Sequence, residues 1–221
     1  LWPNKSFPNK KILNSAAPNN PVFLTRIDGH SAWINDFTIK KTNLNIDENV
    51  DGGKIINQCI LIDNAMNLVR NHIPKPTKEM IKKWLVSGSN YAKEKGITNV
   101  HDAWQSPEII EAMLELVEKE EMPIKCYGMI GASFTDYIHD FFKRGHHSGT
   151  HYKIRSVKAF IDGALGSRGA ALHEPYSDDH CNCGLILISK EEFDELASLC
   201  YNYNFQVCTH AIGDRGNEFV L

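Results

Sequence analysis

The sequence predicts an α/β fold in which parallel strands alternate with crossover helices. From about residue 88 onward, short apolar runs of strand length alternate with longer segments whose apolar residues recur at helical spacing. Polar side chains follow these apolar runs, as is typical of the carboxyl edge of a parallel sheet, where α/β proteins place their chemistry. The runs are apolar on both sides, which predicts strands that are buried on both faces.

Each expected element has its own local signal. Gly96 stops the first helix, and Ser106 with Pro107 gives the second helix a capping residue and a favourable first turn. The expected helices are 78–95, 106–120, 136–144 and 190–202, and the expected strands are 97–100, 124–130, 157–161 and 205–209.

The first part of the chain has a different composition and predicts a different domain. Residues 1–75 are rich in Asn, Lys and Pro, with a strand expected at 21–26 and an irregular stretch at 36–53. We interpret them as an inserted subdomain, and residues 76–221 as the main α/β domain. Residue 1 is Leu and residues 216–221 resemble the start of a helix, so both ends are expected to continue in a longer chain.

Composition excludes several classes of function. The 221 residues carry 24 Lys+Arg and 27 Asp+Glu, a net charge of −3, so no basic field attracts nucleic acid. No apolar run approaches the roughly 20 residues that a membrane helix requires, and the longest, 59–62 and 184–188, have the length of strands. The six cysteines are too sparse for a disulfide scaffold, which favours free thiols and a reducing compartment such as the cytoplasm.

Lys158 and His210 are the candidate residues for chemistry. Lys158 lies in a strand expected to be buried, where its amine should be paired, neutral or carboxylated, because an unpaired buried ammonium is unfavourable. The alternative is a lysine at a strand end that reaches solvent. His210 follows the strand 205–209, where an imidazole can ligate a metal, act as an acid or base, or only complete local hydrogen bonds.

Two further clusters contain ligand-type residues without a recognised metal-binding spacing. We interpret both as exposed loops rather than metal sites. The first contains His173, His180, Cys181 and Cys183, and the second contains His146, His147 and His151.

Four separated blocks of the sequence resemble amidohydrolase family 3, which includes N-substituted formamide deformylase and the exoenzyme regulatory protein AepA. The first two blocks are RIDGHSAWIN (26–35) and GITNVHDA (96–103). The other two are VKAFIDGALGSRGAAL (157–172), followed by EPYSD (174–178), and CTHAIGDRGN (208–217).

This resemblance implies a metal-dependent hydrolase on a distorted (β/α)8 TIM barrel. The strands 97–100, 124–130, 157–161 and 205–209 would be barrel strands two to five, so the chain would form a partial barrel. Residues 1–75 would be inserted between strands one and two. Lys158 matches the family's bridging lysine, often carboxylated, and His210 matches its fifth-strand histidine.

The resemblance also implies the remaining parts of the site. The divalent metal, one or two ions and most simply zinc, would bind at Lys158 and His210. The family's His-x-His pair, sixth-strand histidine and eighth-strand aspartate have no counterpart within residues 1–221, so the general base is expected beyond residue 221. The expected substrate-contacting residues are His30, Trp33, His101, Asp162 and Arg168.

The function implied is hydrolysis of a carbon–nitrogen bond other than a peptide bond, in a small-molecule substrate, by metal-activated water. The alternative is a non-catalytic regulatory or binding protein on the same scaffold, related to AepA, and a third reading is a short, degenerate gene product. The expected partner is the substrate, with no nucleic acid and no membrane, and the sequence is compatible with a homo-oligomer.

Overall fold

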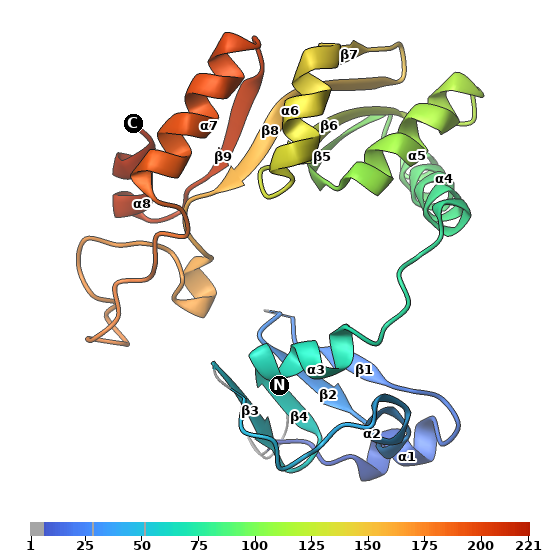
Figure 1. The fold of residues 1–221 in the computed structure, drawn as a ribbon, viewed down its shortest axis with the longest axis vertical. Helices are drawn as coiled ribbons and strands as arrows, with labels where there is room; N and C mark the ends of the chain where they lie inside the picture. Colours follow the sequence, from blue (N-terminus) through green and yellow to red (C-terminus); the bar gives the residue numbers. More distant parts are fainter. Residues whose placement is uncertain (1–6, 28, 51) are drawn as a thin grey trace. The chain divides into compact units, whose positions relative to one another are not determined.

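The structure is a computed structural model that describes residues 7–27, 29–50 and 52–221. The chain divides into two compact units, Leu1–Lys75 and Pro76–Leu221, and each is described by itself (Figure 1).

The first unit is built around a four-stranded antiparallel sheet in the order β1-β2-β4-β3. Its strands are β1 (Phe23–Thr25), β2 (Ser31–Ile34), β3 (Gly53–Ile56) and β4 (Ile60–Asp63). Its helices are α1 (Lys11–Ala16), α2 (Asp36–Thr42) and α3 (Asn67–Arg70), with the 3₁₀ turn η1 (Asn64–Met66). A core that includes Ile34, Leu61 and Met66 packs the sheet against α2, α3 and η1.

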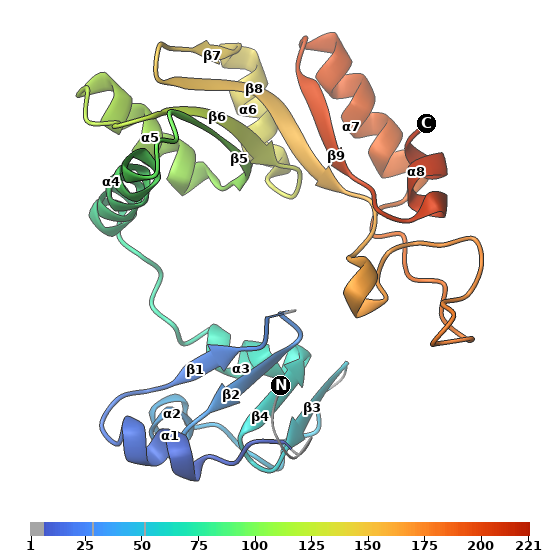
Figure 2. The ribbon, with the colours of Figure 1, turned by 180° about the vertical axis from the view of Figure 1, so that it is seen from behind.

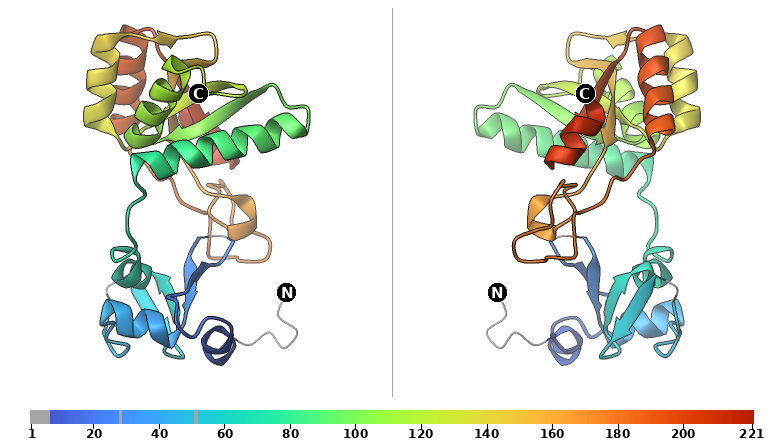
Figure 3. Two further views of the ribbon diagram at one scale, coloured as in Figure 1. Left: turned by 90° about the vertical axis from the view of Figure 1, so that its right-hand side faces the viewer. Right: turned by 90° about the vertical axis from the view of Figure 1, so that its left-hand side faces the viewer.

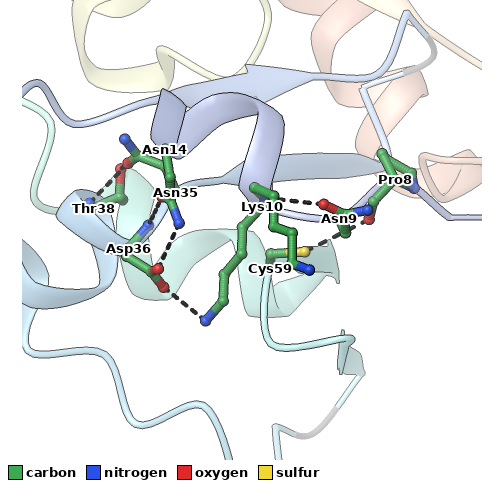
Figure 4. A network of polar contacts seen from close by, with 9 residues as sticks. Pro8, Asn9, Lys10, Asn14, Asn35, Asp36, Thr38 and Cys59 are labelled. Atoms are coloured by element: carbon green, nitrogen blue, oxygen red, sulfur yellow. Dashed lines mark hydrogen bonds and ion pairs between the residues drawn. The ribbon is translucent and has the colours of Figure 1, made fainter. Parts of the chain in front are cut away.

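The expectation of an irregular stretch from residue 36 was wrong, because α2 begins there. The buried Asn35 caps this helix by accepting a 3.0 Å hydrogen bond from the N–H of Thr38, and its amide also donates to the carbonyl groups of Ala17 and Asn20. Figure 4 shows this network, in which Lys10 pairs with Asp36 at 2.7 Å. An asparagine that satisfies several backbone groups is difficult to recognise from composition alone.

The second unit contains four parallel strands in chain order, β5 (Asn99–Gln105), β6 (Lys125–Gly131), β8 (Tyr152–Phe160) and β9 (Gln206–His210). The short β7 (His147–Ser148) pairs antiparallel with β8. The helices are α4 (Lys78–Glu94), α5 (Pro107–Glu118), α6 (Thr135–Arg144), α7 (Lys190–Asn202) and α8 (Asp214–Val220), with the 3₁₀ turn η2 (Leu165–Ser167). The prediction of an α/β fold with a parallel sheet is confirmed.

Apolar residues of α5, α6 and α7 pack on one face of this sheet (Figure 1). The buried core includes Ile110, Met113, Phe141, Ile154 and Val157. Burial of each such side chain stabilises the fold by about 1.5–3 kcal/mol relative to exposure. Strand alternation then directs the remaining side chains to the opposite face, seen from behind in Figure 2.

Several predicted boundaries were wrong. β5 continues to Gln105, so His101 and Asp102 lie inside the strand and not after it. β8 begins at Tyr152, because alternating buried and exposed residues extend it toward its amino end. The run 184–188 is irregular and belongs to the long segment between β8 and α7, drawn in orange in Figure 3.

Among the described residues, no helix combines the length and the apolar character needed to span a bilayer.

Candidate functional site

Lys158 and His210 lie on neighbouring parallel strands and on the same face of the sheet. In the β8–β9 ladder Lys158 is opposite Cys208 and Phe160 is opposite His210. Because side chains alternate along a strand, these four residues share the face opposite the helices. We call this the open face, and it also carries His101 of β5 and Tyr127 of β6, whose rings are 5.2 Å apart.

The Lys158 amine is held in a partly desolvated position. Its Nζ atom lies 4.9 Å from the centre of the Phe160 ring, and the side chain is half-buried. Desolvation lowers the pKa of Lys158, and the nearby Cys208 partly opposes this shift. Among the described residues, no carboxylate forms an ion pair with this amine. A lysine with a lowered pKa has a larger neutral fraction, which is the form that reacts with carbon dioxide.

His210 ends β9 beside the same aromatic ring. Its imidazole centre is 5.1 Å from the Phe160 ring centre, and 27% of its side chain is exposed. The Nε2 atom lies 3.9 Å from Oδ1 of Asp162, which is too long for a hydrogen bond but close enough for electrostatic attraction. The imidazole is therefore positioned between the Phe160 ring and the Asp162 carboxylate.

Asp162 is fully engaged by the backbone. Its buried carboxylate accepts hydrogen bonds from the N–H groups of Ala171 at 2.9 Å, Ile212 at 2.9 Å and Gly213 at 2.7 Å. Burial raises the pKa of Asp162, but these three hydrogen bonds together with the nearby His210 outweigh it, so the net pKa is lowered. Asp162 thus remains an anion that joins the segment after β8 to the segment after β9.

The other predicted substrate contacts have local partners. Arg168 forms a two-pronged ion pair with Asp178 in the segment after β8, at 3.1 and 2.9 Å. In the first unit, His30 Nδ1 lies 2.9 Å from Asp63 Oδ1, and the half-buried Trp33 packs against that unit's core. Their roles toward a substrate, like that of His101, stay predictions.

Three aromatic residues near Lys158 were not predicted from the sequence. Trp104 contacts Phe160 at 5.1 Å and Phe134 at 6.4 Å between ring centres. The available signal was a tryptophan two residues beyond the polar pair His101-Asp102. It was missed because the strand was expected to end at residue 100.

The residues present fit part of a metal site. Within residues 7–27, 29–50 and 52–221, no three His, Cys, Asp or Glu side chains converge closely enough to hold a metal ion. Lys158 and His210 can supply two donors on adjacent strands, an imidazole nitrogen and, once the amine is carboxylated, a carboxylate-like oxygen.

Comparison with known families decides the membership of this chain, because the model of the amidohydrolase family matches residues 1–221. The chain belongs to the amidohydrolase family. It is 28% identical over 234 residues to the protein LONG AFTER FAR-RED 3 of Arabidopsis thaliana, which covers 97% of this chain and 40% of that protein. It is 27% identical over 224 residues to YtcJ of Bacillus subtilis (strain 168), a protein whose name provisionally calls it an amidohydrolase. This match covers 96% of the present chain and 42% of YtcJ.

Two solved structures share the fold of this chain. Uncharacterized metal-dependent hydrolases from Pyrococcus horikoshii OT3 and Pyrococcus furiosus match with TM-scores of 0.78 and 0.75. The identities are 23% and 24%, and the matches cover 97% of this chain but only 44% and 45% of those chains. The chain therefore spans less than half of the relatives it matches.

Proposed function

We propose that the full-length protein is a metal-dependent hydrolase of a carbon–nitrogen bond other than a peptide bond, acting on a small molecule. Lys158 and His210 would be two ligands of one or two divalent cations, with zinc as the first candidate. The observation that carries this proposal is the β8–β9 register, which directs both donors to the open face in a chain of the amidohydrolase family.

The order of the strands supports a barrel interpretation of the second unit. β5, β6, β8 and β9 follow one another in parallel with helices on one face, as do consecutive strands of a (β/α)8 barrel. We interpret them as strands two to five of such a barrel, whose remaining strands and ligands would lie outside residues 1–221. Lys158 and His210 stand at the carboxyl ends of their strands, where barrel enzymes carry their active sites.

The residues of this chain would prepare the site for hydrolysis. The neutral Lys158 amine attacks carbon dioxide, which forms an N–C bond and releases one proton, so that the side chain ends in a carboxylate. His210 offers an imidazole nitrogen, while Asp162 fixes the backbone just after it by accepting hydrogen bonds from the N–H groups of Ile212 and Gly213. Held by Lys158 and His210, a divalent cation would supply a water of lowered pKa and would polarise the scissile carbonyl.

The test is amide hydrolysis by the full-length protein, measured on a panel of simple amides after metal removal and after addition of zinc. We expect zinc to restore turnover in the wild type, and Lys158→Ala and His210→Asn to lower it at least about 100-fold. Lys153→Ala, an exposed lysine of the same strand, is the matched control and should retain full turnover.

The outcomes separate the two functional hypotheses. Zinc-dependent turnover that survives Lys158→Ala would contradict the role of this lysine. A folded full-length protein that binds no metal and hydrolyses no amide would instead support the regulatory or binding alternative.

A further inference from the structure

We propose that Trp104, Phe134 and Phe160, here called the aromatic wall, select substrates that present a flat apolar group, such as a phenyl ring, beside the reacting bond. This inference rests on the proposed hydrolase function for the location of that bond.

The first observation is the backbone at Trp104. Strand alternation would direct Trp104 to the same face as Asp102, toward the helices. A register shift between Ala103 and Gln105 and a φ of 127° at Trp104 interrupt this alternation. A positive φ is a strained conformation for a bulky residue, and strain of this kind is concentrated at functional sites.

The second observation is the space that the indole occupies. A Cβ atom built on Gly131 would lie 2.7 Å from Cε2 of Trp104, so any larger residue at position 131 would displace the indole. Gly131 is paired with Lys158 in the β6–β8 ladder. The glycine therefore leaves room for the indole on the open face, beside the strand position of the candidate metal ligand.

The third observation is that the wall is continuous with both candidate ligands. Phe160 contacts Trp104 at 5.1 Å, the His210 ring at 5.1 Å, and the Lys158 Nζ atom at 4.9 Å. A substrate whose carbonyl lies near Lys158 and His210 would place its neighbouring substituent against these rings.

The fourth observation is the exposure and chemistry of the wall. Phe160 is 38% exposed, and Trp104 and Phe134 are half-buried, so the described part of the chain leaves the wall partly uncovered. Aromatic rings pack most favourably against other flat apolar groups in offset or edge-to-face geometry. The chemistry of the wall therefore favours a planar apolar substituent over a small aliphatic or a charged one.

The experiment compares the binding of phenylacetamide and acetamide, which share the same amide group and differ only by the phenyl ring. Dissociation constants are measured by ligand-observed NMR on the zinc-loaded full-length protein. We expect phenylacetamide to bind about tenfold more tightly than acetamide. In Trp104→Ala the ratio of the two dissociation constants should fall by about fivefold to tenfold. Trp104→Leu keeps an apolar residue without a flat ring, and it should lose the preference to a similar extent.

Trp84→Ala is the matched control, because Trp84 is an exposed tryptophan of α4, at 56% exposure, outside the wall. It should leave the preference unchanged. Equal affinity of the two amides in the wild type, or a preference that survives both Trp104 variants, would overturn the inference. If the preference depends on Trp104 but no amide is hydrolysed, the wall stands and the proposed hydrolase function fails.

Discussion

The N–H of Gly213 donates a 2.7 Å hydrogen bond to the carboxylate of Asp162, 51 residues earlier in the chain. Gly213 caps α8, so this contact joins the segment after β8 to the helix after β9. Ala171 and Ile212 donate to the same carboxylate. The position of His210 therefore depends on a buried carboxylate that accepts hydrogen bonds from three backbone N–H groups and lies 3.9 Å from the imidazole.

Asp162→Asn tests this arrangement. Asparagine has one acceptor oxygen where aspartate has two. Its NH₂ group would face at least one of the backbone N–H groups that now donate to the carboxylate, so that hydrogen bond would be lost and two donors would face each other. We expect the free energy of unfolding of the full-length protein to fall by about 2–3 kcal/mol. Urea unfolding measures the change. Asp178→Asn, at an exposed ion pair, is the control and should change the free energy of unfolding much less than Asp162→Asn.

Gly216→Ala tests the packing around the same carboxylate. A Cβ atom at position 216 would lie 2.6 Å from Oδ2 of Asp162, so the substitution should destabilise the protein by about 1–3 kcal/mol. Gly88→Ala in α4 is the matched control, because its Cβ would have nothing within 4 Å. It should stabilise the protein by about 0.5–1 kcal/mol, since alanine favours a helix interior over glycine. Thermal unfolding of both variants is sufficient, and equal effects would contradict the packing argument.

Tyr152→Phe tests a buried hydrogen bond behind the open face. The Tyr152 hydroxyl donates to Oε1 of Gln105, and both side chains are fully buried. Removing the donor leaves a buried acceptor unsatisfied, which should cost about 1–3 kcal/mol in the free energy of unfolding. Tyr127→Phe removes only a 3.5 Å contact with Gln206 and should change stability by less than about 0.5 kcal/mol. Similar losses in the two variants would refute this prediction.

The lysine partners of Glu115 should make the stability of the protein depend on pH in the acid range. Hydrogen bonds from Lys78 and then Lys82 lower the pKa of Glu115 from 4.5 to about 2. The folded pKa lies below the unfolded value, so the contribution is present above about pH 4.5 and is lost as the pH falls toward 2. The full-length Glu115→Gln variant should therefore show a weaker decrease in stability between pH 4.5 and 2 than the wild type. Glu118→Gln, an exposed position of the same helix, should retain the wild-type slope.

The sequence predicts the parallel strands and their helices well because their signals are local. Apolar periodicity locates α4 and α7, and the Ser106-Pro107 start locates α5, each to within a few residues of the observed bounds. The antiparallel sheet of the first unit was not predicted, since its short strands are defined by pairing across loops.

Only part of the candidate site could be predicted from the sequence, for the same reason. The pattern around Lys158 and His210 can be read in the sequence, but their common face depends on register. The ion pair between Arg168 and Asp178 and the rotation of Trp104 onto the open face arise from loop geometry and a β-bulge, which the sequence pattern does not reveal.

The most direct test of the account is the metal content of the full-length protein after zinc loading and removal of free metal. We predict one or two zinc ions per chain in the wild type and in Lys153→Ala, and less than half of the wild-type content in Lys158→Ala combined with His210→Asn. The same zinc content in the double variant, with its fold intact by circular dichroism, would contradict the assignment of Lys158 and His210 as ligands.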